Sequence, residues 1–191
     1  KETFATSGPR ILVRFFAGWN FNSELLGQED FVSQAYASGV PMGGDLPRGP
    51  DGKAPGFLIM TMKDSEGANL DRVQVIKAWI DSKGESHEKV FDIAAADNRQ
   101  VDIKTGKLPA VGNTVNADNA SYTNTIGGAT ISVYWEDPEF NAKQQSFYYV
   151  RVLEIPTPRW STYDAVTLGT KPMDPISIQE RAITSAIWYK P

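Results

Sequence analysis

The sequence predicts a mainly β fold: an antiparallel β-sandwich, immunoglobulin-like or similar, with one N-terminal helix and long loops. Short runs rich in β-branched and aromatic residues recur along the 191 residues, which is typical of strands. Several runs alternate apolar and polar side chains, as a strand with one buried face does. Because strands follow strands without intervening helices, two packed antiparallel sheets are expected rather than a parallel α/β sheet.

The N-terminal part is expected to hold one strand, one helix and one long loop. Residues 10–17 (RILVRFFA) form a short apolar run of strand length. Between 22 and 38, apolar residues recur at helical offsets and a glycine follows, which predicts a helix beginning near Asn22 or Gln28. Residues 40–56 are crowded with glycine and proline, so they are expected to be loop.

The middle of the chain predicts a buried strand, a hairpin and a long connection. Residues 57–63 (FLIMTMK) are apolar throughout, as in a strand covered on both faces. Residues 71–81 and 88–96 flank a Ser-Lys-Gly turn and predict a hairpin. The polar residues 97–128 are expected to be connections, with one short strand around 111–115.

The C-terminal part predicts three more strands. Residues 129–137 (ATISVYWED) alternate between two faces, and 145–155 (QSFYYVRVLEI) form the strongest strand pattern in the chain. Residues 155–164 (IPTPRWSTYD) are rich in proline and are expected to be irregular. A last strand is expected over 180–189 (ERAITSAIWY).

Composition narrows the possible partners. The net charge of -4 and the pI of about 5.1 argue against nucleic acid, which requires a basic surface. No apolar run approaches the ~18 residues of a membrane-spanning helix, so no membrane insertion is expected. The chain has no cysteine, which excludes disulfides and thiolate ligands within it and is compatible with either the cytoplasm or export.

Few residues suggest catalytic chemistry. His87 is the single histidine, and Glu85 and Glu88 flank it in GESHEK. A zinc or iron site needs several converging ligands, so a solvent-exposed loop histidine is the preferred interpretation. The acidic segment 63–71 (KDSEGANLD) resembles a calcium loop only loosely, and a solvated turn is preferred over a structural cation site.

Three residues are candidates for ligand or domain contact. Asp45 follows two glycines in PMGGDL, where it could meet a ligand or another domain, or could cap the backbone of a tight turn. Trp160, beside Arg159, lies in the proline-rich segment and is the tryptophan expected to be exposed. Three other tryptophans fall within predicted strands and are expected in the core: Trp79, Trp135 and Trp188.

Five phrases of the sequence carry a family resemblance: FATSGPRILVRFF, YASGVPMGGDLP, ANLDRVQVIKAWID, FYYVRVLEIPTPRWSTYDA and QERAITSAIWY. Together they resemble the C-terminal portion of the bacterial domain-of-unknown-function 3604 family, whose members are relatives of PHP-type metal-dependent hydrolases. The resemblance covers nearly the whole chain in order.

The resemblance implies a longer protein with a catalytic domain and an accessory domain. The metal-binding His and Asp motifs of such proteins lie on an upstream barrel-like catalytic domain, which would hold a divalent metal. Residues 1–8 would be the tail end of that domain, and 9–191 the accessory sandwich, with no catalytic residue and no metal ligand of its own. The upstream domain would be its partner, and a periplasmic or secreted location is favoured.

Two alternative functions are therefore considered. In the first, the chain is a non-catalytic domain of a hydrolase of phosphoester or other ester bonds, and Asp45, Arg159 and Trp160 shape one wall of the catalytic cleft. In the second, it is a free-standing module that binds carbohydrate or another ligand through an exposed aromatic platform. A broad apolar patch near residues 1–45 would favour the first function.

Overall fold

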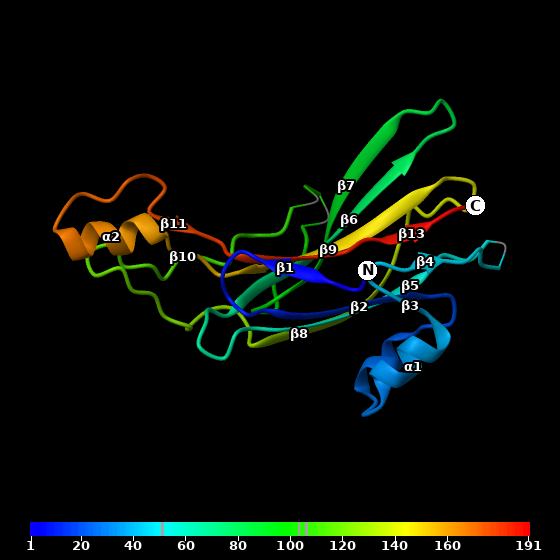
Figure 1. Cartoon of the computed structure of the whole chain (residues 1–191), viewed down its shortest axis with the longest axis horizontal. Helices are drawn as coiled ribbons and strands as arrows, with labels where there is room; N and C mark the ends of the chain where they lie inside the picture. The colour runs from blue at the N-terminus through cyan, green and yellow to red at the C-terminus, as the bar shows by residue number, and fades with distance from the viewer. Residues whose placement is uncertain (51, 103, 106) are drawn as a thin grey trace.

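The computed structural model describes residues 1–191 apart from 51, 103 and 106. It confirms a mainly β chain with two main sheets in a sandwich-like arrangement (Figure 1), antiparallel apart from one short parallel pair. No described helix is both long enough and apolar enough to cross a membrane.

The smaller sheet has four strands in the order β3-β2-β5-β8. They span Val40–Pro41, Leu12–Gly18, Gly56–Met62 and Thr130–Glu136, respectively. All neighbours are antiparallel, and β5 pairs along its whole length with both β2 and β8. This central place explains why the β5 sequence is apolar without alternation, since both of its faces are covered.

The larger sheet has seven strands. They are β1 (Phe4–Thr6), β4 (Asp45–Leu46), β6 (Leu70–Ile80), β7 (Ser86–Ala95), β9 (Ser146–Glu154), β12 (Arg181–Thr184) and β13 (Ile187–Tyr189). Strand β9 is its centre: β6 pairs with one edge, and β12 and β13 share the other. Strands β6 and β7 form the predicted hairpin, which projects beyond the sandwich body (Figure 1).

The single strand predicted over 180–189 is wrong, because the structure divides it into β12 and β13. The break falls at Ser185 and Ala186, whose backbone groups bind another part of the chain. The Ser185 N–H donates to the Thr3 carbonyl at 2.9 Å, and the Ala186 carbonyl accepts from the Gly43 N–H at 3.0 Å. These bonds satisfy polar groups that a continuous strand would have paired with β9.

Within this chain, part of the segment 1–8 belongs to the larger sheet. Strand β1 pairs antiparallel with β12, with Phe4 opposite Thr184. Its origin as the tail end of an upstream domain stays a prediction.

The helical predictions need three corrections. The helix expected over 22–38 is two elements, a 3-10 helix η1 (Ser23–Gly27) and an α-helix α1 (Phe31–Ser38), because Gln28 is extended between them. A second α-helix, α2 (Trp160–Leu168), replaces the irregular segment expected over 155–164. The described residues of 111–115 form no strand, since the Thr114 hydroxyl bonds the Thr123 carbonyl across an irregular loop.

The helix α2 sits in an arm at one end of the molecule (Figure 1). Strands β10 (Thr157–Pro158) and β11 (Ser177–Ile178) pair antiparallel at its base. The helix begins after Pro158, whose fixed φ suits the approach to a helix, and it ends at Gly169 in the left-handed conformation. Its inner side buries small residues, Ser161, Thr162 and Ala165.

Apolar side chains form two cores. The main core lies between the sheets and includes Phe15, Phe57 and Tyr148. A second core lies on the outer face of the smaller sheet, where α1 and η1 cover Phe16 and Leu58. Both side chains are almost fully buried.

One ion pair is buried beside the main core. The Lys77 ammonium group donates to Asp137 at 2.5 Å, and the Tyr148 hydroxyl donates to the same carboxylate at 2.8 Å. Such a charge pair is tolerated inside because both partners are satisfied.

Candidate functional site

Asp45 is exposed at the edge of the larger sheet, in a short strand that runs parallel to β13. The two glycines before it form a tight turn, in which the Gly44 N–H donates to the Pro41 carbonyl at 3.0 Å. Gly43 has a φ of +83°, and a Cβ there would lie 2.2 Å from the Lys1 carbonyl oxygen. Gly43 is therefore required for the turn and for the close approach of the N-terminal backbone.

Trp160 is exposed as predicted, with 65% of its surface accessible. Arg159 occupies the N-cap position of α2, and its guanidinium group lies over the Trp160 ring at 5.7 Å from the centroid. The structure thus brings Arg159 and Trp160 together on the arm. Asp45 lies near the opposite end of the molecule (Figure 1), so the three residues do not form one site within this chain.

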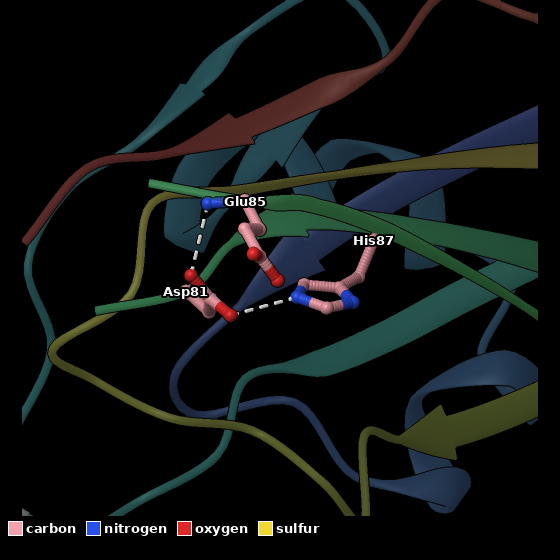
Figure 2. Close-up of side chains that lie close together, drawn as sticks. All are labelled: Asp81, Glu85 and His87. Atoms are coloured by element: carbon pink, nitrogen blue, oxygen red, sulfur yellow. Dashed lines mark hydrogen bonds and ion pairs between the residues drawn. The ribbon is translucent and has the colours of Figure 1, made fainter. Parts of the chain in front are cut away.

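The tip of the β6–β7 hairpin gathers the one histidine and two carboxylates. The ligand atoms of Asp81, Glu85 and His87 lie within 4.8 Å of one another, and no other such group of three occurs among the described residues. Figure 2 shows the Glu85 carboxylate beside the bonded Asp81–His87 pair. Nε2 of His87 lies 2.9 Å from Oδ2 of Asp81. That hydrogen bond, aided by backbone N–H donors, holds the pKa of Asp81 below its usual value.

The acidic segment 63–71 forms no comparable group. The Asp64 carboxylate accepts the backbone N–H groups of Arg10 at 2.8 Å and Glu66 at 3.1 Å, which lowers the pKa of Asp64. Asp71 is fully buried and pairs with Arg72 and Arg99. The preferred interpretation of the Asp64 segment as a turn agrees with this geometry.

A cleft of about 710 Å³ opens between the N-terminal segment and the smaller sheet. Its walls are mostly apolar and include Phe4, Leu12, Met42, Met60 and Met62. Leu12 is 51% exposed and Met62 45% exposed, although both belong to sheet strands. Phe4, Leu12 and Met42 of its walls belong to residues 1–45, whereas Met60 and Met62 belong to β5.

The outer face of the larger sheet carries a second apolar surface, made of aromatic rings. The Phe147 ring lies 4.7 Å from Trp188 and 6.5 Å from Tyr149, centroid to centroid. Trp188 is 41% exposed, so its expected place in the core is wrong. Its ring points outward because the neighbouring Ile187 and Tyr189 take the inward positions of β13.

Glu154 is a buried carboxylate with no substrate access, since it is only 2% exposed. Its Oε1 atom has no hydrogen-bond partner. Burial, reinforced by the nearby charge of Glu180, raises the pKa of Glu154 to about 7. Because it is buried, Glu154 is not a candidate for binding at the surface.

A comparison of the sequence with known families places the chain. Residues 1–191 match the family described as protein of unknown function (DUF3604). The chain belongs to this family. No curated protein and no solved structure matches it. Membership of DUF3604 confirms the family part of the resemblance, and the relation to PHP-type hydrolases stays a prediction.

Sequence reasoning about this DUF3604 chain missed Asp81 as a partner of the histidine. It considered Glu85 and Glu88, the two acids nearest to His87. The hairpin register places Ile80 opposite Ser86 and Trp79 opposite His87, so Asp81 closes the turn while Glu88 points to the other face. A register derived from the turn could have found Asp81.

Proposed function

We propose that this chain is a non-catalytic β-sandwich domain that packs against the catalytic domain of a PHP-type metal-dependent hydrolase acting on phosphoester or other ester bonds. The divalent metal of the reaction would be bound by that partner domain. The observation that carries the proposal is the arm formed by α2 and its flanking strands. It exposes large apolar side chains at a projecting position, where a free domain would gain nothing from them.

The exposure on the arm is high for side chains of this size. Trp160 is 65% exposed, Leu168 73% and Met173 66%. Several large apolar side chains exposed on one projecting element are suited to contact with another protein. Tryptophan and arginine are also the residues that most often dominate binding energy at interfaces, and Arg159 stacks on Trp160 here. We therefore propose that Arg159 and Trp160 contact the partner domain and form part of one wall of its catalytic cleft.

The apolar cleft supports the same proposal from a different side of the sandwich. Phe4, Leu12 and Tyr36 are all at least about one-third exposed, and each belongs to the first 45 residues. Of the three, Phe4 and Leu12 line the cleft, and exposed apolar side chains there are suited to contact with another domain. Asp45 lies within the same part of the sequence and stays a candidate for that contact.

The chemical part of the proposal is tested with the chain alone. Purified chain is incubated with p-nitrophenyl phosphate and p-nitrophenyl acetate in the presence of zinc or manganese ions. No metal-dependent turnover is expected, because the chain offers a single imidazole and no thiolate. Turnover that a chelator abolishes and that His87→Ala removes would contradict the proposal.

The docking part is tested in the full-length gene product. Trp160→Ala there should lower the temperature of thermal unfolding and the protection of residues 160–168 from hydrogen exchange, because a buried ring would be lost from the contact. Trp188→Ala, which removes an exposed tryptophan from the other face, is the matched control. Equal effects of the two substitutions, or equal protection of α2 in the isolated chain and the full product, would argue against docking through the arm.

A specific observation also favours the second function, a carbohydrate-binding module. Trp188, Phe147 and Tyr149 form a row of rings on the outer face of the larger sheet, and such rings can stack on sugars. Calorimetric titration against a glycan panel tests it. Heat that Trp188→Ala abolishes and Trp160→Ala leaves unchanged would support this function over docking.

A further inference from the structure

The tip of the β6–β7 hairpin has the composition of a small metal-binding site. It brings together one imidazole and two carboxylates, from His87, Asp81 and Glu85. Asp81 and Glu85 lie at the two ends of the turn, and His87 follows on β7 (Figure 2). Nitrogen and oxygen donors of this kind suit zinc and its neighbours in the first transition row.

The Asp81 carboxylate is already oriented. Its Oδ1 atom accepts the backbone N–H groups of Lys83 at 2.8 Å and Glu85 at 2.9 Å. These bonds use one oxygen and direct the other, Oδ2, toward His87. Hydrogen bonds that fix a ligand from behind are what hold metal ligands in place.

The His87 imidazole is oriented as well. It stacks on the Trp79 ring with centroids 5.3 Å apart and planes 20° apart, and the two residues are directly opposite in the hairpin. The His87 side chain is 39% exposed. An ion can therefore reach a ring whose orientation the neighbouring indole restricts.

The two donors lie close to the spacing that a bound ion needs. Tetrahedral zinc binds imidazole nitrogen and carboxylate oxygen at about 2.0–2.2 Å, which places two such ligands about 3.4 Å apart. His87 Nε2 and Asp81 Oδ2 are 2.9 Å apart and share a hydrogen bond, so an ion would replace the shared proton and the two side chains would separate by about half an ångström. The exposed Glu85 side chain needs only a rotation about its own bonds to supply a third ligand, and water completes the shell.

We propose that Asp81, Glu85 and His87 form a binding site for a divalent ion of the zinc class, which closes the hairpin tip as a non-catalytic clip. Calcium and magnesium are not the expected ions, because they prefer shells made of oxygen alone. The site is independent of the proposed docking function, since it lies on the hairpin and needs no partner.

Trp79 provides a direct readout of occupancy. Nickel and copper ions quench tryptophan fluorescence at contact distance, and the Trp79 ring stacks on the imidazole that would hold the ion. Titration of the chain with nickel chloride should give saturable quenching at one equivalent, and Trp79→Phe should remove that phase. Zinc chloride should compete for the same site, and calcium chloride should not.

Matched variants separate this site from adventitious binding. His87→Gln and Glu85→Gln should each weaken zinc binding about tenfold or more, measured by calorimetry, because each removes a ligand. Glu85→Gln keeps the backbone N–H that Asp81 accepts, so the turn is preserved. Glu88→Gln, one residue from His87 on the opposite face, should bind zinc like the original chain.

The outcomes decide the proposal in either direction. Loss of binding in His87→Gln and Glu85→Gln with retention in Glu88→Gln supports it. Failure to observe saturable binding, or equal binding by His87→Gln and the original chain, overturns it. Circular dichroism of each variant without metal verifies that the hairpin is still folded.

Discussion

The two outer faces of the sandwich differ in how far their large apolar side chains are covered. The face of the smaller sheet buries Phe16 and Leu58 beneath α1 and η1. No helix of the described residues covers the face of the larger sheet, where the Phe147 ring packs against Tyr149 and Trp188 and all three side chains stay partly exposed. Both faces carry large apolar side chains, so sequence alternation alone does not reveal which face is covered. Covered rings act in stability, and uncovered rings are available for binding.

The largest expected effect on stability comes from a substitution on the covered face. Phe16→Ala should destabilise the chain by about 3–5 kcal/mol, because the ring is 1% exposed and its removal leaves a cavity beneath α1. Denaturant unfolding followed by circular dichroism measures the change. A loss below about 1 kcal/mol would mean that α1 collapses onto the sheet and that the cover is not tightly packed.

The second effect concerns Glu154, which is buried at the end of β9. Its pKa is about 7 in the folded chain and 4.5 when exposed. The folded state therefore holds a proton that the unfolded state releases, and stability falls as pH rises from about 4.5 through 7. Glu154→Gln removes this dependence and should raise stability by roughly 2 kcal/mol at pH 8, with little gain at pH 4.5.

Unfolding of the original chain and Glu154→Gln across this pH range provides the measurement. Glu180→Gln, which removes the neighbouring exterior charge, is the control and should give a smaller change. Parallel curves for Glu154→Gln and the original chain would show that the carboxyl is not protonated in the folded state.

The smallest effect belongs to the uncovered face. Trp188→Ala should cost about 1 kcal/mol, well below Phe16→Ala, because 41% of the ring is already in water and the substitution leaves no closed cavity. The same unfolding experiment measures it. A cost equal to that of Phe16→Ala would erase the distinction between the two faces.

The sequence predicted the strands well where alternation or length was distinctive. Residues 129–137 and 145–155 correspond to β8 and β9, and the predicted hairpin corresponds to β6 and β7. Helix α2 was missed because its apolar residues lie around the helix rather than along one stripe, and because prolines precede it. This helix depends on its packing within the arm, and a local sequence pattern does not show such packing.

The candidate site was less predictable than the fold. Exposure of Trp160 followed from its loop-like context, whereas the outward position of Trp188 depended on where β12 ends and β13 begins. The group around His87 depended on the register of a hairpin, and a shift of one residue would have turned the imidazole to the other face. Such facts emerge from pairing between segments, which individual runs of sequence do not contain.

The pairing of β1 with β12 has a consequence for how the chain acquires its structure. These strands lie far apart in the sequence, with Phe4 opposite Thr184, so this edge of the larger sheet cannot form until residues 181–184 have been synthesised. Contacts between such distant segments slow folding, because a very long loop must close before they form. During synthesis β1 therefore stays without β12 until those residues have been made.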